Sequence, residues 1–77
     1  MTDEQERKKL FVSGALTTLL REATGRYVLH LHYHVDGHDE IVTVTYASMT
    51  QQDVNVSCDS EWAIAKDVMS AVADRFE

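Results

Sequence analysis

The chain has 77 residues, of which 44% are hydrophobic and 26% charged, and its 13 acidic and 7 basic side chains give a net charge of −6. This length fits one small globular domain, residues 1–77, and leaves no room for a large enclosed active-site cavity. The acidic charge argues against a nucleic-acid-binding surface, the single cysteine excludes an internal disulfide, and no apolar run approaches the ~20 residues of a membrane span.

The first predicted element is a helix over residues 2–24. Thr2 is followed three positions later by Gln5, which is the spacing of a capping box. Gly25 comes directly after the last periodic residue and is a natural helix stop in the left-handed conformation. Apolar residues at helical spacing predict one buried stripe along this helix, made of Val12, Leu16, Leu19, Leu20 and Ala23 and widened by Phe11 and Ala15.

Two strands are predicted next, over residues 26–35 and 40–47, with Asp36-Gly37 as a tight turn between them. Strict alternation of apolar and polar residues indicates that each strand has one buried and one solvated face. A two-residue turn at Asp36-Gly37 would place Leu31 opposite Val42 and His34 opposite Asp39. The residues expected to face the core are Tyr27, Leu29, Leu31, Tyr33 and Val35 on the first strand and Val42, Val44 and Tyr46 on the second.

A polar loop at Ser48–Gln52 precedes a third predicted strand over residues 53–58. Val54, Val56 and Cys58 should point inward there, with Val44 opposite Val56. A closing helix over residues 59–76 follows, with Asp59 or Ser60 as its cap. Its apolar stripe is expected to run through Trp62, Ala65, Met69, Val72 and Phe76, widened by Ile64, Val68 and Ala71.

These elements predict an α+β fold in two layers, in which a three-stranded antiparallel meander carries both helices on one face (α-β-β-β-α). Both helical stripes need burial and the sheet has one apolar face, so both helices should cover that face. The other face of the sheet is then open to solvent. It should display His30, His32, His34, Asp39, Ile41, Thr43, Thr45, Asn55 and Ser57.

The histidines of the first strand form a candidate metal site. Alternate residues of a strand share a face at a backbone spacing of roughly 7 Å, so a His-x-His pair is able to converge on one ion. Zinc or another metal that favours imidazole would fit a set made of His30, His32, His34 and Asp39. Two alternatives remain open: a plain solvated sheet face, and a pH sensor in which neighbouring imidazolium groups repel one another.

Catalysis and cofactor binding are not expected. Cys58 is predicted beside the start of a helix, which favours a reactive thiolate, but it should be buried and no histidine is predicted on its face. The chain also shows no serine–histidine–acid arrangement, no glycine-rich phosphate loop and no paired carboxylates with a pocket.

The predicted element order resembles that of double-stranded RNA-binding domains, which also consist of a helix, three strands and a helix. Such domains carry basic residues at the start of their second helix. The corresponding residues here are Asp59-Ser60-Glu61-Trp62-Ala63-Ile64-Ala65-Lys66, with two acids and one base. The resemblance therefore implies a shared topology without nucleic-acid binding.

A second resemblance concerns the C-terminal part of the chain. Val54-Asn55-Val56, Asp59-Ser60, Ala65 and Asp67-Val68 resemble small proteins of phages, prophages and conjugative elements of Gram-positive bacteria. Those proteins have no assigned activity. The resemblance implies an accessory role in binding another protein.

Three functional hypotheses follow. The first is a small, non-catalytic protein-interaction module whose partner is either another protein or a second copy of the chain. No signal peptide is visible, so the expected location is the cytoplasm, and neither a membrane nor a nucleic acid is expected as a partner. The second is a metal-binding protein that uses the histidine row, and the third is an acidic mimic of nucleic acid that inhibits a host factor. The first would use either the open sheet face (His30, His32, His34, Ile41, Thr43, Thr45, Asn55 and Ser57) or the excess apolar width of the closing helix at Ile64, Val68 and Ala71.

Overall fold

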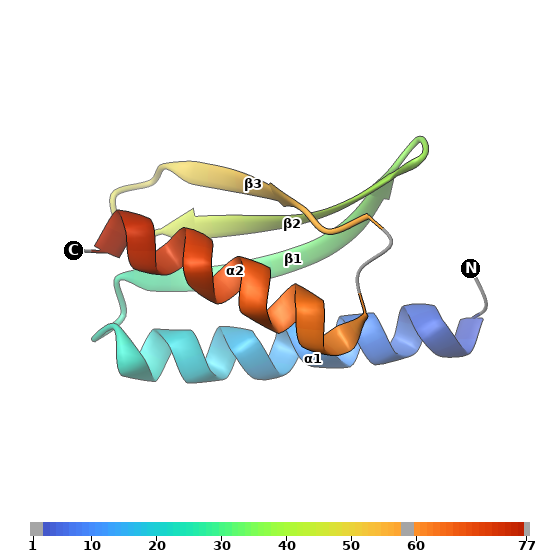
Figure 1. The fold of residues 1–77 in the computed structure, drawn as a ribbon. Helices are drawn as coiled ribbons and strands as arrows, with labels where there is room; N and C mark the ends of the chain where they lie inside the picture. Colours follow the sequence, from blue (N-terminus) through green and yellow to red (C-terminus); the bar gives the residue numbers. More distant parts are fainter. Residues whose placement is uncertain (1–2, 58–59, 77) are drawn as a thin grey trace.

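The computed structural model describes residues 3–57 and 60–76. It confirms the predicted α+β fold with the order helix, three strands, helix (Figure 1). The sheet is antiparallel, with β2 between β1 and β3. The elements are α1 (Asp3–Ala23), β1 (Val28–Asp36), β2 (Asp39–Tyr46), β3 (Gln51–Asn55) and α2 (Glu61–Phe76).

The two helices lie on the same face of the sheet and run in the same direction (Figure 1). This arrangement gives two layers with one apolar core between them, as expected when both helical stripes share the one apolar face of the sheet. All five elements or their flanks contribute to the core, which contains Leu16, Leu20, Val28, Leu31, Tyr33, Val42, Val44, Tyr46, Val56, Ile64, Val68 and Val72.

Helix α1 packs on the sheet through a face that differs from the predicted stripe. Leu16 and Leu20 are buried as expected, but Lys9 and Ser13 complete the buried face in place of Leu19 and Phe11. These residues recur every three or four positions and therefore form one face of the helix. Ala15 and Ala23 are also exposed. The helix is rotated about its axis relative to the prediction because Lys9 has a buried partner on β2, described below.

From His30 onward the β1–β2 hairpin keeps the predicted faces, but its register is displaced by two positions. Leu31 lies opposite Val44 rather than Val42, because Asp36 pairs with Asp39 and the loop consists of Gly37 and His38. Gly37 has a φ of 64°, a conformation that favours glycine.

A register irregularity interrupts β1 between Val28 and His30. As a result Val28 is completely buried while Leu29 is exposed, which is the reverse of the predicted alternation. One extra residue in one strand of a ladder changes the face on which the preceding residues lie. The predicted inward position of Leu29 was therefore wrong. Val35 stays in phase with Leu31 and Tyr33, but it is 51% exposed because it lies at the hairpin end, so it is not a core residue as predicted.

Strand β3 begins earlier than predicted, and its register differs by four positions. Val44 lies opposite Gln52 and Thr43 opposite Asp53, because the turn spans only residues 47–50. Met49 closes this turn with a φ of 69°, and its N–H donates to the Tyr46 carbonyl at 2.9 Å. Gln52 lies on the core face of the sheet, where its polar side chain is satisfied because Oε1 accepts a hydrogen bond from the Tyr46 hydroxyl at 2.7 Å.

Helix α2 begins after Ser60, whose hydroxyl accepts the Ala63 N–H at 3.2 Å and caps the helix. Its buried face is centred on Ile64, Val68 and Val72, whereas Trp62 is 72% exposed and was wrongly predicted to be core. Cys58 and Asp59 lie outside the described residues, as does Thr2.

Candidate functional site

The open face of the sheet carries the histidine row, as predicted. The rings of His30 and His32 are stacked with centroids 6.3 Å apart, and those of His32 and His34 are 5.4 Å apart. His34 Nε2 lies 2.9 Å from Thr43 Oγ1, whose hydrogen is donated to Asp53 Oδ1 at 2.8 Å. Because the Thr43 hydrogen is already committed to Asp53, His34 Nε2 must be the donor in its contact with Thr43.

The predicted metal set is not assembled within residues 3–57 and 60–76, where no three histidine, cysteine or acidic side chains are placed to hold one ion. Asp39 does not lie opposite His34, since the observed register places it opposite Asp36 and gives Ile41 to His34. The rest of the predicted surface is partly or fully exposed on β2 and β3 or just after them: Ile41, Thr43, Thr45, Asn55 and Ser57.

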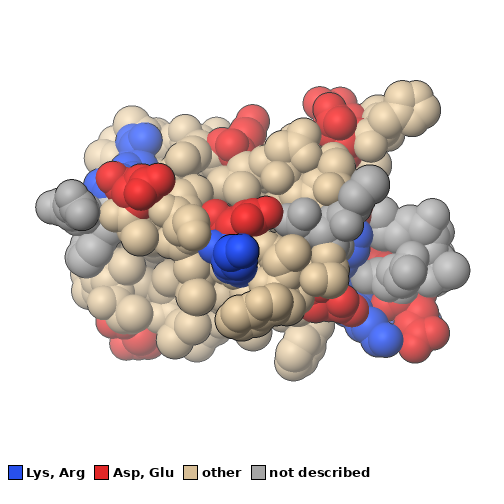
Figure 2. Space-filling view, in the orientation of Figure 1, with Lys and Arg blue, Asp and Glu red and all other residues tan. Residues whose placement is uncertain are grey.

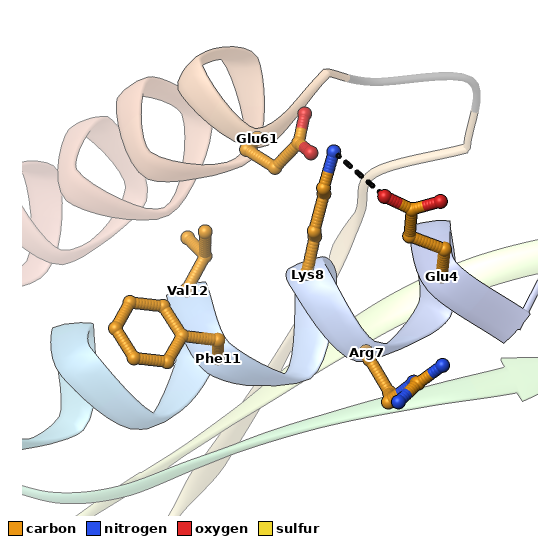
Figure 3. A pocket seen from close by; sticks show the side chains of 6 residues that line it. All are labelled: Glu4, Arg7, Lys8, Phe11, Val12 and Glu61. Atoms are coloured by element: carbon orange, nitrogen blue, oxygen red, sulfur yellow. Dashed lines mark ion pairs between the residues drawn. The ribbon is translucent and has the colours of Figure 1, made fainter.

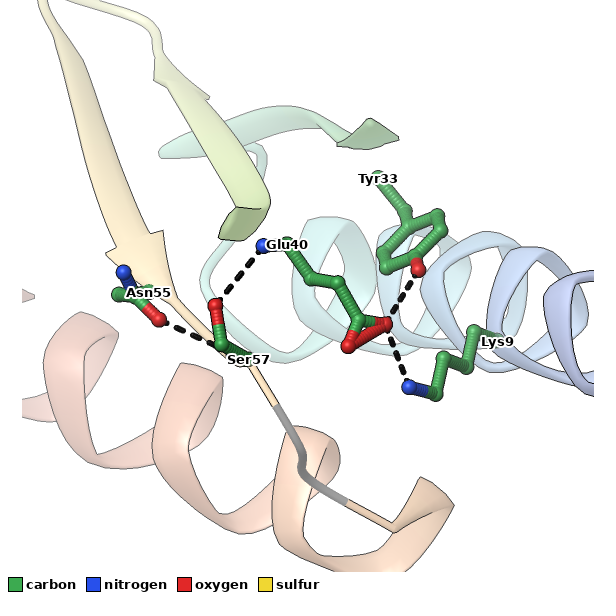
Figure 4. A network of polar contacts seen from close by, with 5 residues as sticks. All are labelled: Lys9, Tyr33, Glu40, Asn55 and Ser57. Carbon is green, nitrogen blue, oxygen red and sulfur yellow. Dashed lines mark hydrogen bonds and ion pairs between the residues drawn. The ribbon is translucent and has the colours of Figure 1, made fainter. Parts of the chain in front are cut away.

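A buried polar cluster joins α1 to the hairpin (Figure 4). Glu40 Oε1 accepts hydrogen bonds from Lys9 Nζ at 2.5 Å and from Tyr33 Oη at 2.6 Å. The Glu40 backbone N–H donates to Ser57 Oγ at 2.9 Å. Lys9 and Glu40 are no more than 9% exposed, so this ion pair is almost fully removed from water. It fixes the position of α1 along the sheet, since a buried charge without its partner is costly.

Sequence reasoning missed this cluster, although the signal was present. Glu40 lies two and four positions before Val42 and Val44, so it points to the same inward face of β2. Lys9 lies one turn before Ser13 on the buried face of α1. Charged side chains are almost never fully buried unless they are paired. Opposite charges at the buried positions of the two elements, Lys9 on α1 and Glu40 on β2, were therefore the indication of a buried ion pair.

We expect the folded protein to lose stability at alkaline pH because Tyr33 and Tyr46 are buried. Burial, with Glu40 nearby, holds the pKa of Tyr33 well above its usual value, and burial also raises the pKa of Tyr46 against the opposing effect of Arg75. A raised folded-state pKa means that the unfolded chain releases these protons first. Stability is therefore complete below about pH 10, the usual tyrosine value, and falls as the pH rises above it.

Urea unfolding measured between about pH 8 and pH 11 checks this expectation. The wild-type midpoint should fall steeply above about pH 10, and Tyr33→Phe should flatten that fall whatever its effect at neutral pH. An equally steep fall in Tyr33→Phe would contradict the role assigned to the Tyr33 hydroxyl.

An open groove of about 730 Å³ runs between the N-terminal halves of α1 and α2 (Figure 3). Val12 and Lys8 point from α1 toward α2, and Glu61 points from α2 into the same space. Phe11 lines the groove and is 76% exposed. Lys8 Nζ lies 3.6 Å from Glu4 Oε1 in an exposed ion pair at one end.

Exposed apolar residues also occur on both helices beyond the lining of this groove. Glu61 lines it, so the side of α2 that carries Glu61 and Ala65, one turn apart, is the side that meets α1. By helical spacing Trp62 and Met69 lie next to Ala65 on α2, and they are 72% and 38% exposed. The sequence prediction had located the excess apolar surface of this helix at Ile64, Val68 and Ala71, but Ile64 and Val68 are fully buried and Ala71 half-buried. We use the name helical face for the exposed set Phe11, Ala15, Leu19, Trp62 and Met69.

Charge does not single out a separate surface on the side shown in Figure 2. Acidic and basic side chains are scattered there between uncharged residues, without a continuous patch of either sign. Neither α1 nor α2 has the length and apolar character to cross a membrane, as far as the described residues extend.

Comparison with known proteins gives no relative for this arrangement. No family model matches the chain, and neither a curated protein nor a solved structure is significantly similar to it.

Proposed function

We propose that this chain is a small, non-catalytic, cytoplasmic protein-interaction module that binds its partner through the helical face. The observation that carries the proposal is the exposure of two large aromatic side chains, Phe11 and Trp62, on neighbouring helices. Single exposed apolar residues are common, but a contiguous apolar surface of a few hundred Å² with a polar rim is typical of protein-binding sites. Aromatic residues also dominate the energetic centres of such sites.

The open sheet face is the less favoured surface. Its histidine, threonine and asparagine side chains are polar, and Thr43 already bonds to His34 and Asp53 across all three strands. Such a face loses hydrogen bonds to water when it is covered, whereas the helical face gains from the burial of apolar area. An accessory role in a phage or mobile element would suit a binding module of this size.

Selection from a random peptide library displayed on phage tests the proposal without knowledge of the natural partner. We expect the wild-type chain to enrich peptides with apolar anchors, and Phe11→Glu or Trp62→Glu to reduce their binding by about 30-fold or more, the range of an interface hot spot. Met49→Glu is the matched control, because Met49 is 82% exposed but lies in the β2–β3 turn. Peptide binding that is lost in Met49→Glu or in His32→Ala, and kept in both helical variants, would refute the proposal.

A further inference from the structure

We propose that the partner of the helical face is a second copy of this chain, packed antiparallel along α1 with Ala15 of both copies at a two-fold axis. This inference rests on the proposed function, because it names the occupant of the same face. The observation that carries it is a self-complementary ridge on α1 with Ala15 at its centre. Phe11 and Leu19 lie four positions before and after Ala15, and Lys8 and Glu22 lie seven positions before and after it.

The ridge follows from the spacing of its residues. Glu4, Lys8, Phe11, Ala15, Leu19 and Glu22 are separated by three or four positions and so lie along one side of α1. Each of them is exposed. This spacing is the pattern by which two helices pack along a shared seam.

Two-fold symmetry then determines which residues meet. In an antiparallel pair centred on Ala15, Phe11 of one copy contacts Leu19 of the other, and Lys8 of one copy contacts Glu22 of the other. Symmetry produces each of these contacts twice. The small Ala15 side chain at the centre allows the two helices to approach closely.

The charges on the ridge are complementary in this register. Lys8 lies near the start of α1 and Glu22 near its end, so an antiparallel pair brings opposite charges together at both ends of the seam. A parallel pair in register would instead place Lys8 against Lys8 and Glu22 against Glu22, which is repulsive. Exposed charges of this kind determine register and orientation more than affinity.

The exposed area agrees with this occupant. An aromatic side chain offers roughly 150–250 Å², so Phe11 and Trp62, at 76% and 72% exposure, provide on the order of 300 Å² per copy. Leu19 and Met69 add further apolar area, and the side chains of Lys8 and Glu22 extend it. This apolar area would supply a substantial part of the ~800 Å² per partner of a standard interface, and polar side chains at the rim would supply the remainder.

Trp62 has a natural place in this dimer. It belongs to the first turn of α2, next to Glu61, which lines the groove with Lys8 and Phe11. The antiparallel register brings the Leu19–Glu22 segment of the partner copy to that end of α1. Trp62 would thus cover the outer side of the contact between Phe11 and the partner's Leu19.

Sedimentation equilibrium over a range of micromolar concentrations measures the association. We expect the wild-type chain to form dimers, and Phe11→Glu or Leu19→Glu to raise the dimer dissociation constant by at least about tenfold. Met49→Glu should leave it unchanged. Lys8→Glu and Glu22→Lys should each weaken the dimer, and the double variant should recover most of the affinity because it restores opposite charges in the same register.

A cysteine at the symmetry axis provides a positional test. In a Cys58→Ser background, Ala15→Cys should form a disulfide between two copies under mild oxidation, because a residue on the two-fold axis faces itself at the short Cα separation that a disulfide requires. Thr18→Cys, on the neighbouring exposed side of α1, is the matched control and should crosslink much more slowly.

The outcomes separate the dimer from the proposed function. A wild-type chain that remains monomeric at high micromolar concentration overturns the dimer. So does a dimer that is unaffected by Phe11→Glu and Leu19→Glu, or a double charge variant that fails to recover. A monomer whose selected peptides are still lost on Phe11→Glu would leave the proposed function standing, with an apolar peptide of another protein as the occupant.

Discussion

Replacing Lys9 with alanine is expected to lower the free energy of unfolding by about 3–5 kcal/mol, because it leaves Glu40 as a buried charge without its cation. The carboxylate would keep its hydrogen bond from Tyr33. It would nevertheless have to be protonated or reached by water, and both cost free energy in an apolar interior. Urea unfolding followed by circular dichroism measures the loss.

The matched control is Lys8→Ala, one residue earlier on the exposed side of α1, which should change stability by less than about 0.5 kcal/mol at a concentration where the chain is monomeric. The double variant Lys9→Met, Glu40→Gln removes both charges and keeps an acceptor for the Tyr33 hydroxyl. It should recover most of the stability lost in Lys9→Ala, since an apolar or neutral replacement of a buried ion pair is often tolerated. A loss below about 1 kcal/mol in Lys9→Ala would show that the pair is not buried as described.

The second large effect is expected at the centre of α2. Ile64 is completely buried, and Ile64→Ala should cost about 2–5 kcal/mol through lost apolar contact and the cavity left behind. Trp62→Ala removes a larger side chain only two residues earlier, but it should cost less than about 0.5 kcal/mol in the monomer because Trp62 is 72% exposed.

Urea unfolding at a concentration where the chain is monomeric distinguishes the two positions, since any dimer contact of Trp62 would otherwise add to its effect. If Trp62→Ala were the more destabilising change, the buried side of α2 would instead be the one predicted from its apolar stripe.

The element order and the layers were predictable because strong local signals agreed with one another. The alternation over residues 30–35 defined a strand with one apolar face, and Gly25 and Gly37 marked the end of α1 and the hairpin loop, where both have positive φ. One apolar sheet face and two apolar helical stripes then allowed one arrangement of layers. Registers were less predictable, since a slip by two residues keeps every side chain on its face.

The rotation of each helix could not be predicted from its apolar residues alone. Both α1 and α2 carry more apolar residues than one small sheet covers. The apolar pattern alone therefore allows either Phe11 or Leu20 on the buried side of α1, and either Trp62 or Ile64 on that of α2. Lys9 decided the outcome on α1 through its pairing with Glu40, a contact across a sequence distance that helical periodicity does not report. The surplus that remains outside is the helical face, and for that reason the sequence alone did not locate it.

The packing of α1 also guards the outer edge of β1 against strand addition. Thr17 Oγ1 accepts the N–H of Leu31 at 3.1 Å and donates its own hydrogen to the Ser13 carbonyl at 2.8 Å. A strand edge with unpaired backbone groups is a template for aggregation. Local detachment of α1 would uncover both the core and a backbone edge beside Leu31, so the hydroxyl of Thr17 links resistance to misassembly directly to the docking of a helix.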